Sequence, residues 1–498
     1  MEHEEFDCDV LVIGLGPVGA ALTALLAQRG LRVIAIDKDS TIYPLPRAVH
    51  FDHEIMRLFQ QLGVAEEVGR HARDVPDYEF RAADGTLLMK LPRGGESPSG
   101  WRAGYMFHQP GLEQVLRDLI AGLPSVEARL GVLFEGFVQD TQGVTASLVG
   151  PEGPQSVRAR YLIGCDGASS LVRGAIGGGL YDYKFDEPWL VVDVSTSDAC
   201  RLPTSNIQVC DPARPTTCVF GGPGWHRWEF MLLPGETPEA MTNDAVIEAL
   251  IRPWGCGPVK VERKAVYRFH GLVANRWRSG RAIIAGDAAH QTPPFAGQGM
   301  CSGMRDAANL AWKLEAVLKS QADDALLDTY QAEREPHSRA LIELAIGMGR
   351  IVCTRDPAQA DRRDADMRAA VARGAPPLPP MRPSPFTTGC VLASSPGAGE
   401  LFPQPVSGQG EALQRMDDIM GPEPWLLTRG RALKAVGLRT LSLSCERLAP
   451  FRRDLAKWLV EHSTEAVLVR PDRYVFGSGD ARSLVDAWRK CLQTGLAA

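Results

Sequence analysis

The chain has 498 residues, of which 45% are hydrophobic and 23% are charged, and its formal net charge is −6. This length predicts two or three domains with room for a large cofactor, and the acidic balance argues against a nucleic-acid partner. No apolar run reaches the roughly 18 residues that a membrane span needs. The acidic start, Met1 to Glu5, lacks the features of a signal peptide, so we expect a cytoplasmic protein.

The first forty residues predict a β-α-β unit. Two β-branched apolar runs, Cys8 to Ile13 and Leu31 to Ile36, flank a helical stretch that opens with Gly14-Leu-Gly16-Pro17-Val18-Gly19, and Asp37 and Lys38 follow the second run. The glycines permit a tight turn, the approach of a pyrophosphate and close helix packing, and an acid about 20 residues later binds a ribose hydroxyl. This fingerprint predicts a dinucleotide site but leaves NAD and FAD open.

The next segments predict two helices and a sheet. Ile55 to Leu62 and Leu112 to Ile120 have helical spacing, and the first should end at Gly63. Residues 78–106 and 181–267 are rich in Val, Trp, Phe, Pro and Gly, which indicates antiparallel strands. Because the α/β pattern returns at Ala282 to Ala285, we expect the sheet to be a second domain inserted into the first, with the substrate between them.

Two further motifs place an aspartate after a strand. Asp166-Gly167 follows Tyr161 to Gly164, and Gly286-Asp287 follows Ala282 to Ala285 and leads into Pro294-Phe-Ala-Gly297-Gln298-Gly299-Met300. Such an aspartate can bind sugar or ribityl hydroxyls, although an isolated one is more often a cap or turn former.

The eleven cysteines are scattered, odd in number and without a C-x-x-C pair. We therefore expect neither disulfides nor a metal site, and mostly reduced, buried thiols.

These motifs, in this order, resemble the class A flavoprotein hydroxylases, the family of para-hydroxybenzoate hydroxylase, over nearly the whole chain. The resemblance is closest to the branch that contains 3-(3-hydroxyphenyl)propionate hydroxylase. The matching segments are Pro46 to Ala48, Phe107 to Pro110, Trp189 to Asp193, Cys210 to Pro215, Phe230 to Glu236, Ser302 to Lys313 and Asp328 to Arg334.

The resemblance implies FAD bound across the first fingerprint, with Arg47 and Gln109 near its diphosphate and ribityl chain and Asp287 at the ribityl hydroxyls. The loop Pro294 to Met300 would lie beside the isoalloxazine ring, at the start of a helix. NADH or NADPH would bind transiently near Asp166-Gly167, since the chain has no second fingerprint. The reaction would place dioxygen-derived oxygen on a phenolic ring through a flavin hydroperoxide.

The resemblance also implies the fold class: an α/β Rossmann-like FAD-binding domain, an inserted antiparallel β-sheet substrate domain and a C-terminal thioredoxin-like domain. We assign 1–77, 105–180 and 276–370 to the first, 78–104 and 181–275 to the second, and 386–498 to the third. Between the FAD-binding domain and the C-terminal domain, residues 370–385 have the composition of an extended linker. The third domain resembles that of the phenol hydroxylase branch at Leu468 to Val475 but lacks C-x-x-C, so we expect a structural role or a homodimer contact.

Candidates for the remaining roles are a base near the phenol oxygen and a cation for a substrate carboxylate. His50 is the first choice for the base, followed by His290 and Tyr105. Arg227 and Arg102 are the candidate cations.

We expect a substrate like 3-(3-hydroxyphenyl)propionate in aromatic catabolism. The alternatives are a tailoring hydroxylase of a polycyclic or polyketide phenol and, in another class, a non-catalytic dinucleotide-binding sensor. A flavin halogenase is disfavoured because the chain lacks a Trp-x-Trp-x-Ile-Pro segment.

Overall fold

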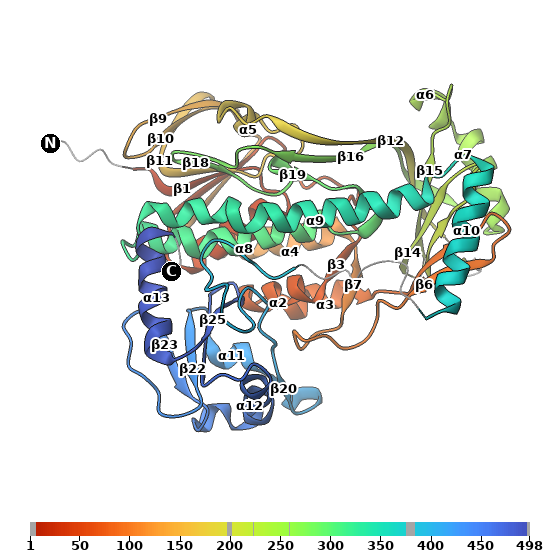
Figure 1. Cartoon of the computed structure of the whole chain (residues 1–498). Helices are drawn as coiled ribbons and strands as arrows, with labels where there is room; N and C mark the ends of the chain where they lie inside the picture. The colour runs from red at the N-terminus through yellow and green to blue at the C-terminus, as the bar shows by residue number, and fades with distance from the viewer. Residues whose placement is uncertain (1–5, 197–201, 223, 258, 375–383, 496–498) are drawn as a thin grey trace.

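The computed structural model describes residues 6–196, 202–222, 224–257, 259–374 and 384–495. Figure 1 shows a sheet-and-helix body near the N-terminus, a second sheet at the far end of two long helices, and a smaller C-terminal part beside them. No helix in these ranges is long and apolar enough to cross a membrane. Within the same ranges, no group of three or more His, Cys, Asp or Glu side chains could hold a metal ion.

The first sheet confirms the predicted β-α-β unit, because its strands β1 and β2 pair in parallel. On its other edge, β1 pairs in parallel with β11 of the same sheet. Its strands are β1 (Cys8–Ile13), β2 (Val33–Asp37), β8 (Val126–Leu130), β9 (Leu133–Gln139), β10 (Val144–Gly150), β11 (Gly153–Gly164), β17 (Arg278–Ser279) and β18 (Ala282–Ile284). The order β18-β11-β1-β2 brings the ends of β1, β11 and β18 together. All three strands are therefore followed by one of the predicted cofactor motifs at the same edge of the sheet.

Helices cover this sheet, which explains why its central strands are apolar on both faces. Those that contact its strands are α1 (Pro17–Gln28), α4 (Gln109–Ala121) and α5 (Leu171–Ala175), and α8 (Gly299–Leu318) packs on α1. The other helices of this part of the chain are α2 (His53–Leu62), α3 (Ala65–His71) and α9 (Asp328–Val352). The α1 helix packs against α4 and α8. As predicted, α2 ends at Gly63, which adopts the left-handed conformation with φ of 79°.

The second sheet joins both predicted β segments. Its strands are β5 (Tyr78–Arg81), β6 (Leu87–Leu91), β12 (Leu180–Ser195), β13 (Asn206–Val209), β14 (Thr216–Gly222), β15 (Trp225–Met231), β16 (Lys260–Ala274) and β19 (His290–Gln291). The expectation of a wholly antiparallel sheet is wrong at one place, because β13 and β5 pair in parallel. These strands come from distant parts of the chain, so no hairpin constrains their directions.

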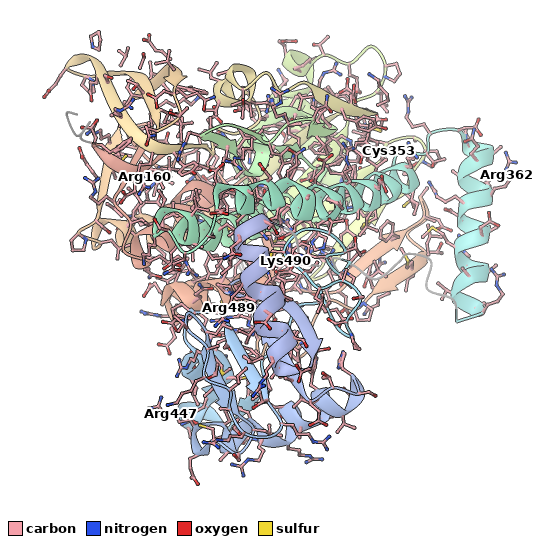
Figure 2. All side chains as sticks on the ribbon, turned by 60° about the vertical axis from the view of Figure 1, so that its left-hand side comes forward. Arg160, Cys353, Arg362, Arg447, Arg489 and Lys490 are labelled. Atoms are coloured by element: carbon pink, nitrogen blue, oxygen red, sulfur yellow. A yellow bond between two sulfur atoms is a disulfide. The ribbon has the colours of Figure 1, made fainter. Side chains whose placement is uncertain are left out.

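One face of this second sheet is apolar and is covered by α6 (Pro238–Met241) and α7 (Asp244–Ile251). The residues 104–107 do not join it: β7 (Gly104–Phe107) pairs instead with β3 (His50–Asp52) and β4 (Ala72–Asp74). Figure 2 shows α10 (Pro357–Ala372), which carries Arg362, at the outer side of the molecule, where it packs against β6. The predicted linker is thus helical at its start, and its residues 375–383 lie outside the described ranges.

The C-terminal part contains a four-stranded sheet of order β23-β22-β24-β25. The elements are α11 (Met416–Met420), β22 (Trp425–Thr428), β23 (Arg439–Ser442), α12 (Arg452–Glu461), β24 (Ala466–Val469), β25 (Val475–Gly479) and α13 (Ala481–Thr494). The first two strands are parallel, and β24 is antiparallel to both of its neighbours. This mixed sheet with α12 and α13 is consistent with a thioredoxin-like domain.

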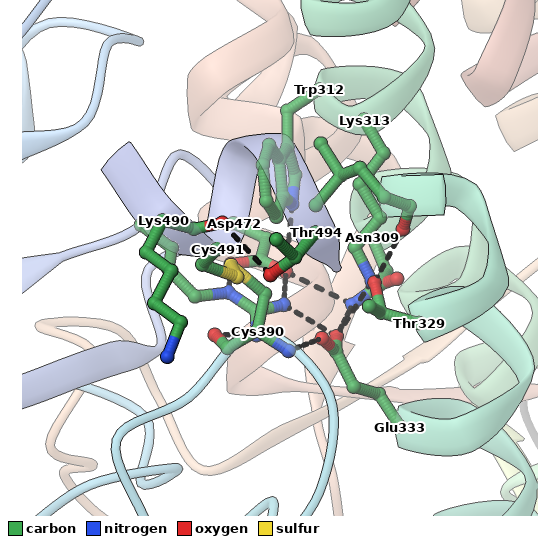
Figure 3. The surroundings of a disulfide bond; sticks show 12 residues. Asn309, Trp312, Lys313, Thr329, Glu333, Cys390, Asp472, Lys490, Cys491 and Thr494 are labelled. Carbon is green, nitrogen blue, oxygen red and sulfur yellow. Dashed lines mark hydrogen bonds and ion pairs between the residues drawn. A yellow bond between two sulfur atoms is a disulfide. The ribbon is translucent and has the colours of Figure 1, made fainter. Parts of the chain in front are cut away.

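The expectation that the chain has no disulfide is wrong, because Cys390 and Cys491 are bonded (Figure 3). They are 101 positions apart, and only the packing of α13 against the segment around residue 390 brings them together. Beside them, Glu333 of α9 accepts hydrogen bonds from Asn309 and Arg470 and pairs with Lys313. This buried network fixes the C-terminal part to α8 and α9.

Candidate active site

The glycine turn after β1 has the geometry that a dinucleotide requires. Gly14 has φ of 96°, and a Cβ there would lie 2.4 Å from the carbonyl oxygen of Cys165. A Cβ on Gly19 would lie 1.9 Å from the carbonyl oxygen of Gly14, whereas one on Gly16 would meet nothing within 4 Å. The first and third glycines are therefore needed by the fold, and the second faces open space at the start of α1, where a phosphate can approach.

Asp37 and Gln109 organise the loops on either side of this turn. Asp37 accepts a 2.8 Å hydrogen bond from the Leu15 amide. The side-chain oxygen of Gln109 accepts hydrogen bonds from the amides of Arg47 and Ala48, at 3.0 and 2.6 Å. Through these two hydrogen bonds, the Gln109 side chain holds the backbone at Arg47 and Ala48 in place.

The two aspartates of the later motifs have different surroundings. Asp166 caps α5 by accepting hydrogen bonds from the Ser170 hydroxyl and the Val172 amide. Asp287 is open to solvent, yet burial by the surrounding chain raises its pKa, while His290 and Arg47 oppose the rise. Asp287 thus presents an accessible carboxyl group that is close enough to Arg47 to interact with it electrostatically, which suits a polyhydroxylated ligand.

The loop after Asp287 is held by three side chains from distant segments. Successive carbonyl oxygens accept hydrogen bonds from Tyr78 (Phe295 carbonyl, 2.9 Å), Arg93 (Ala296 carbonyl, 3.2 Å) and His50 (Gly297 carbonyl, 3.2 Å). Gly297 has φ of 65°, and α8 begins two residues later, as predicted for this loop. The Phe295 ring packs edge-on against Phe185, Trp189 and Phe269. The loop is therefore rigidly attached to the second sheet.

The three candidate bases do not converge on one point. His50 and Tyr105 lie on paired strands, with His50 opposite Met106 and Tyr105 opposite Phe51, so their side chains leave opposite faces. The Tyr105 hydroxyl accepts a hydrogen bond from the Arg102 amide. His290 is 1% exposed and binds Asp306 at 2.7 Å. A substrate cannot reach His290, so its expected role is not supported.

His50 is the candidate that contacts the loop Pro294 to Met300, but it is a weak base. Its Nδ1 donates to the Gly297 carbonyl. Burial lowers the pKa of His50 to about 4, and Arg93 acts in the same direction. The imidazole is neutral at pH 7 and holds the loop in place.

Both candidate cations pair with carboxylates of the protein itself. The buried Arg227 makes a two-point contact with Asp193 and donates to the carbonyls of Pro46 and Arg47, at 2.6 and 2.9 Å. Arg102 pairs with Asp74 at the surface, where 43% of its side chain is exposed. Arg227 thus links the second sheet to the loop around Arg47.

Several residues of this site are not among the candidates predicted from the sequence. They are Tyr78, Arg93, Asp193, Glu229 and Arg263, and Arg263 also donates to the Pro46 carbonyl and to Tyr267. One signal was present: Arg227 and Glu229 stand two apart in a strand whose intervening residue is Trp228, so one face is charged and the other apolar.

The comparisons with known proteins agree with this geometry. The family model described as "FAD binding domain" matches residues 7–345. The chain belongs to this family. It is 39% identical, over 94% of its own length and 91% of the relative's, to a "Probable NADH-specific resorcinol 4-hydroxylase" of Rhodococcus jostii (strain RHA1). It is 35% identical, over 83% and 75%, to a "3-(3-hydroxy-phenyl)propionate/3-hydroxycinnamic acid hydroxylase" of Mycolicibacterium smegmatis (strain ATCC 700084 / mc(2)155).

Solved structures share the fold. Aklavinone-11 hydroxylase with FAD and aklavinone superposes with a TM-score of 0.79 at 24% identity, covering 98% of this chain and 99% of that one. The p-nitrophenol 4-monooxygenase PnpA from Pseudomonas putida DLL-E4 gives 0.67 at 29% identity, covering 73% and 93%. The chain is an FAD-dependent monooxygenase of phenolic aromatic compounds that uses a nicotinamide co-substrate.

The chain's own residues fit FAD. The open space at Gly16 suits a pyrophosphate, and the exposed Asp287 near Arg47 suits a ribityl chain. When bound, FAD supplies the hydride acceptance and dioxygen activation that side chains cannot provide. The protein contributes orientation and the exclusion of water.

Proposed function

We propose that this enzyme adds one hydroxyl group to a small, monocyclic phenol, consuming one NADH, one proton and one dioxygen and releasing NAD⁺ and water. The polar face of the second sheet supports this proposal. From that face Arg227 binds the carbonyls of the Arg47 loop and Tyr78 binds the Phe295 carbonyl, so a substrate lying on it is directed to both predicted flavin-binding loops. The 39% identical relative named for NADH and resorcinol favours this co-substrate and a small ring.

We assign the cofactor roles as follows. Gly14, Gly16, Gly19 and Asp37 hold the FAD nucleotide, Arg47 its diphosphate and Asp287 its ribityl chain, while 294–300 faces the isoalloxazine. Asp166-Gly167 lies at the entry for NADH. A cytoplasmic location and a homodimer remain predictions from the sequence.

The test is to purify the protein, record its visible spectrum and follow NADH and NADPH oxidation with resorcinol, phenol and 3-(3-hydroxyphenyl)propionate, while assaying product and peroxide. We expect yellow protein, NADH oxidation stimulated by a small phenol, and one hydroxylated product per NADH. Colourless protein that cannot be reconstituted with FAD would contradict the proposal. Yellow protein whose NADH oxidation none of these three monocyclic phenols stimulates would favour a tailoring role on a larger phenol instead.

A further inference from the structure

Glu229 is buried on the polar face of the second sheet with no hydrogen-bond donor for its carboxylate among the residues that the structure describes. Only 7% of the residue is exposed, and burial raises its pKa. Its direct neighbours across the strands are Thr217 of β14 and Val191 of β12. The carboxylate oxygens are not among the fully enclosed side-chain atoms that lack a partner, so a donor from outside the protein can reach them. A largely buried acceptor gains from such a donor.

The neighbouring donors on one side all point away from Glu229. The Thr217 hydroxyl donates to the Gln208 side-chain oxygen at 2.8 Å, and the Gln208 amide donates to the Tyr78 hydroxyl at 2.6 Å. Tyr78 in turn donates to the Phe295 carbonyl. This relay directs both hydroxyl groups toward the predicted flavin loop, and none of the three side chains donates a hydrogen bond to the Glu229 carboxylate.

The cations on the other side are likewise engaged. Arg227 is directed at Asp193 and at the carbonyls of Pro46 and Arg47. Arg263 donates to the Pro46 carbonyl and to Tyr267. Both influence Glu229 electrostatically, but neither donates a hydrogen bond to it.

The position of Glu229 is set by these two groups of contacts. Arg227 and Glu229 are two residues apart on one strand and therefore share a face. Arg227 donates a hydrogen bond to the Arg47 carbonyl, and Tyr78 donates one to the Phe295 carbonyl. The charge of Glu229 also contributes to the raised pKa of Tyr78. Glu229 thus lies between the two attachments of the sheet to the predicted flavin loops.

We propose that Glu229 is a substrate-specificity residue that accepts a hydrogen bond from a second ring hydroxyl of the phenol. The site then selects uncharged dihydroxybenzenes over phenols with a carboxylate arm, because a carboxylate brings no donor and adds a second negative charge beside a buried one. This inference rests on the proposed function.

The test measures equilibrium binding to the oxidised, FAD-loaded enzyme by calorimetry, without NADH. The probes are resorcinol, phenol and 3-(3-hydroxyphenyl)propionate, and the variants are Glu229→Leu, Glu229→Gln and the control Glu187→Gln. Glu187 is a half-buried carboxyl of the same sheet whose pKa is also raised by burial. We expect Glu229→Leu to raise the Kd of resorcinol about tenfold or more and that of phenol less than about threefold.

Glu229→Gln retains an acceptor oxygen, so we expect a smaller loss, and the control should leave all three Kd values unchanged. If Glu229→Leu does not fold, a fall in the resorcinol-to-phenol affinity ratio of Glu229→Gln supports the inference and an unchanged ratio overturns it. Equal weakening of phenol and resorcinol, or tighter wild-type binding of the carboxylated phenol, also overturns it. In those cases wild-type turnover of any small phenol leaves the proposed function intact, whereas no turnover of any of them removes the proposed function itself.

Discussion

The Tyr78 hydroxyl donates a 2.9 Å hydrogen bond to the carbonyl oxygen of Phe295 and so ties the second sheet to the predicted flavin loop. Tyr78→Phe removes this bond and leaves the ring in place. We expect FAD content to stay at the wild-type level but the yield of hydroxylated product per NADH to fall at least about twofold, because a loosened site admits water. Peroxide release per NADH measures this loss.

A matched control is Tyr161→Phe, which removes a buried tyrosine's hydrogen bond to Asp324, a residue just before α9. Its coupling should equal that of the wild type. Equal coupling in Tyr78→Phe as well would show that the Phe295 contact has no role in excluding water.

Gly16 is the one glycine of the fingerprint where a methyl group meets no protein atom within 4 Å. Gly16→Ala should therefore fold with an unchanged melting temperature of the apoprotein. It should nevertheless raise the Kd for FAD at least about tenfold, because the methyl group occupies the space of the pyrophosphate. Fluorescence titration of apoprotein with FAD measures this change.

Gly69→Ala, within α3, is the control, since its Cβ would lie 4.0 Å from the nearest side-chain atom, that of Met56, and α3 carries no residue of the fingerprint. It should bind FAD as the wild type does. A wild-type Kd for Gly16→Ala would refute the placement of the pyrophosphate.

Arg227 and Arg102 should behave differently when replaced by alanine. Among the described residues, Arg227→Ala leaves the buried Asp193 with Arg263 as its one remaining cation, so we expect a loss of about 3–5 kcal/mol in the free energy of unfolding. Arg102→Ala breaks a partly exposed pair and should cost less than about 1 kcal/mol. Urea unfolding monitored by tryptophan fluorescence compares the two. A stable Arg227→Ala whose only defect is a raised KM for a carboxylated phenol would restore the carboxylate-binding role.

The low pKa of His50, about 4, predicts a pH dependence of stability. Between pH 6.5 and 4 the unfolded chain binds a proton at this position and the folded chain does not, so the stability that neutral His50 permits is lost as the pH falls through this window. Asn can keep a donor for the Gly297 carbonyl but does not titrate. When the pH is lowered from 6.5 to 5, we expect the free energy of unfolding of His50→Asn to fall by about 2 kcal/mol less than that of the wild type. Parallel stability curves for both proteins would rule out a buried, neutral His50.

The sequence by itself determined the cofactor half of this protein. The glycine turn, Asp37 and the two later aspartates are local signals, since each depends on the conformation of a few consecutive residues at a strand end. The thirteen-residue helix α4 and the cap at Gly63 were likewise predictable, because periodicity and capping act within single turns.

Only the tertiary structure decided the substrate half. Whether Arg227 binds a substrate or Asp193 depends on which strand lies beside β15, and whether His290 is a base depends on Asp306, sixteen positions away on α8. The hydrogen bond from Tyr78 to the Phe295 carbonyl and the disulfide between Cys390 and Cys491 also join residues far apart in the sequence. So does the set of neighbouring donors that form no hydrogen bond with Glu229. A charged side chain in a strand has the same local pattern whether its partner is a ligand or another residue, and long-range packing alone chooses between them.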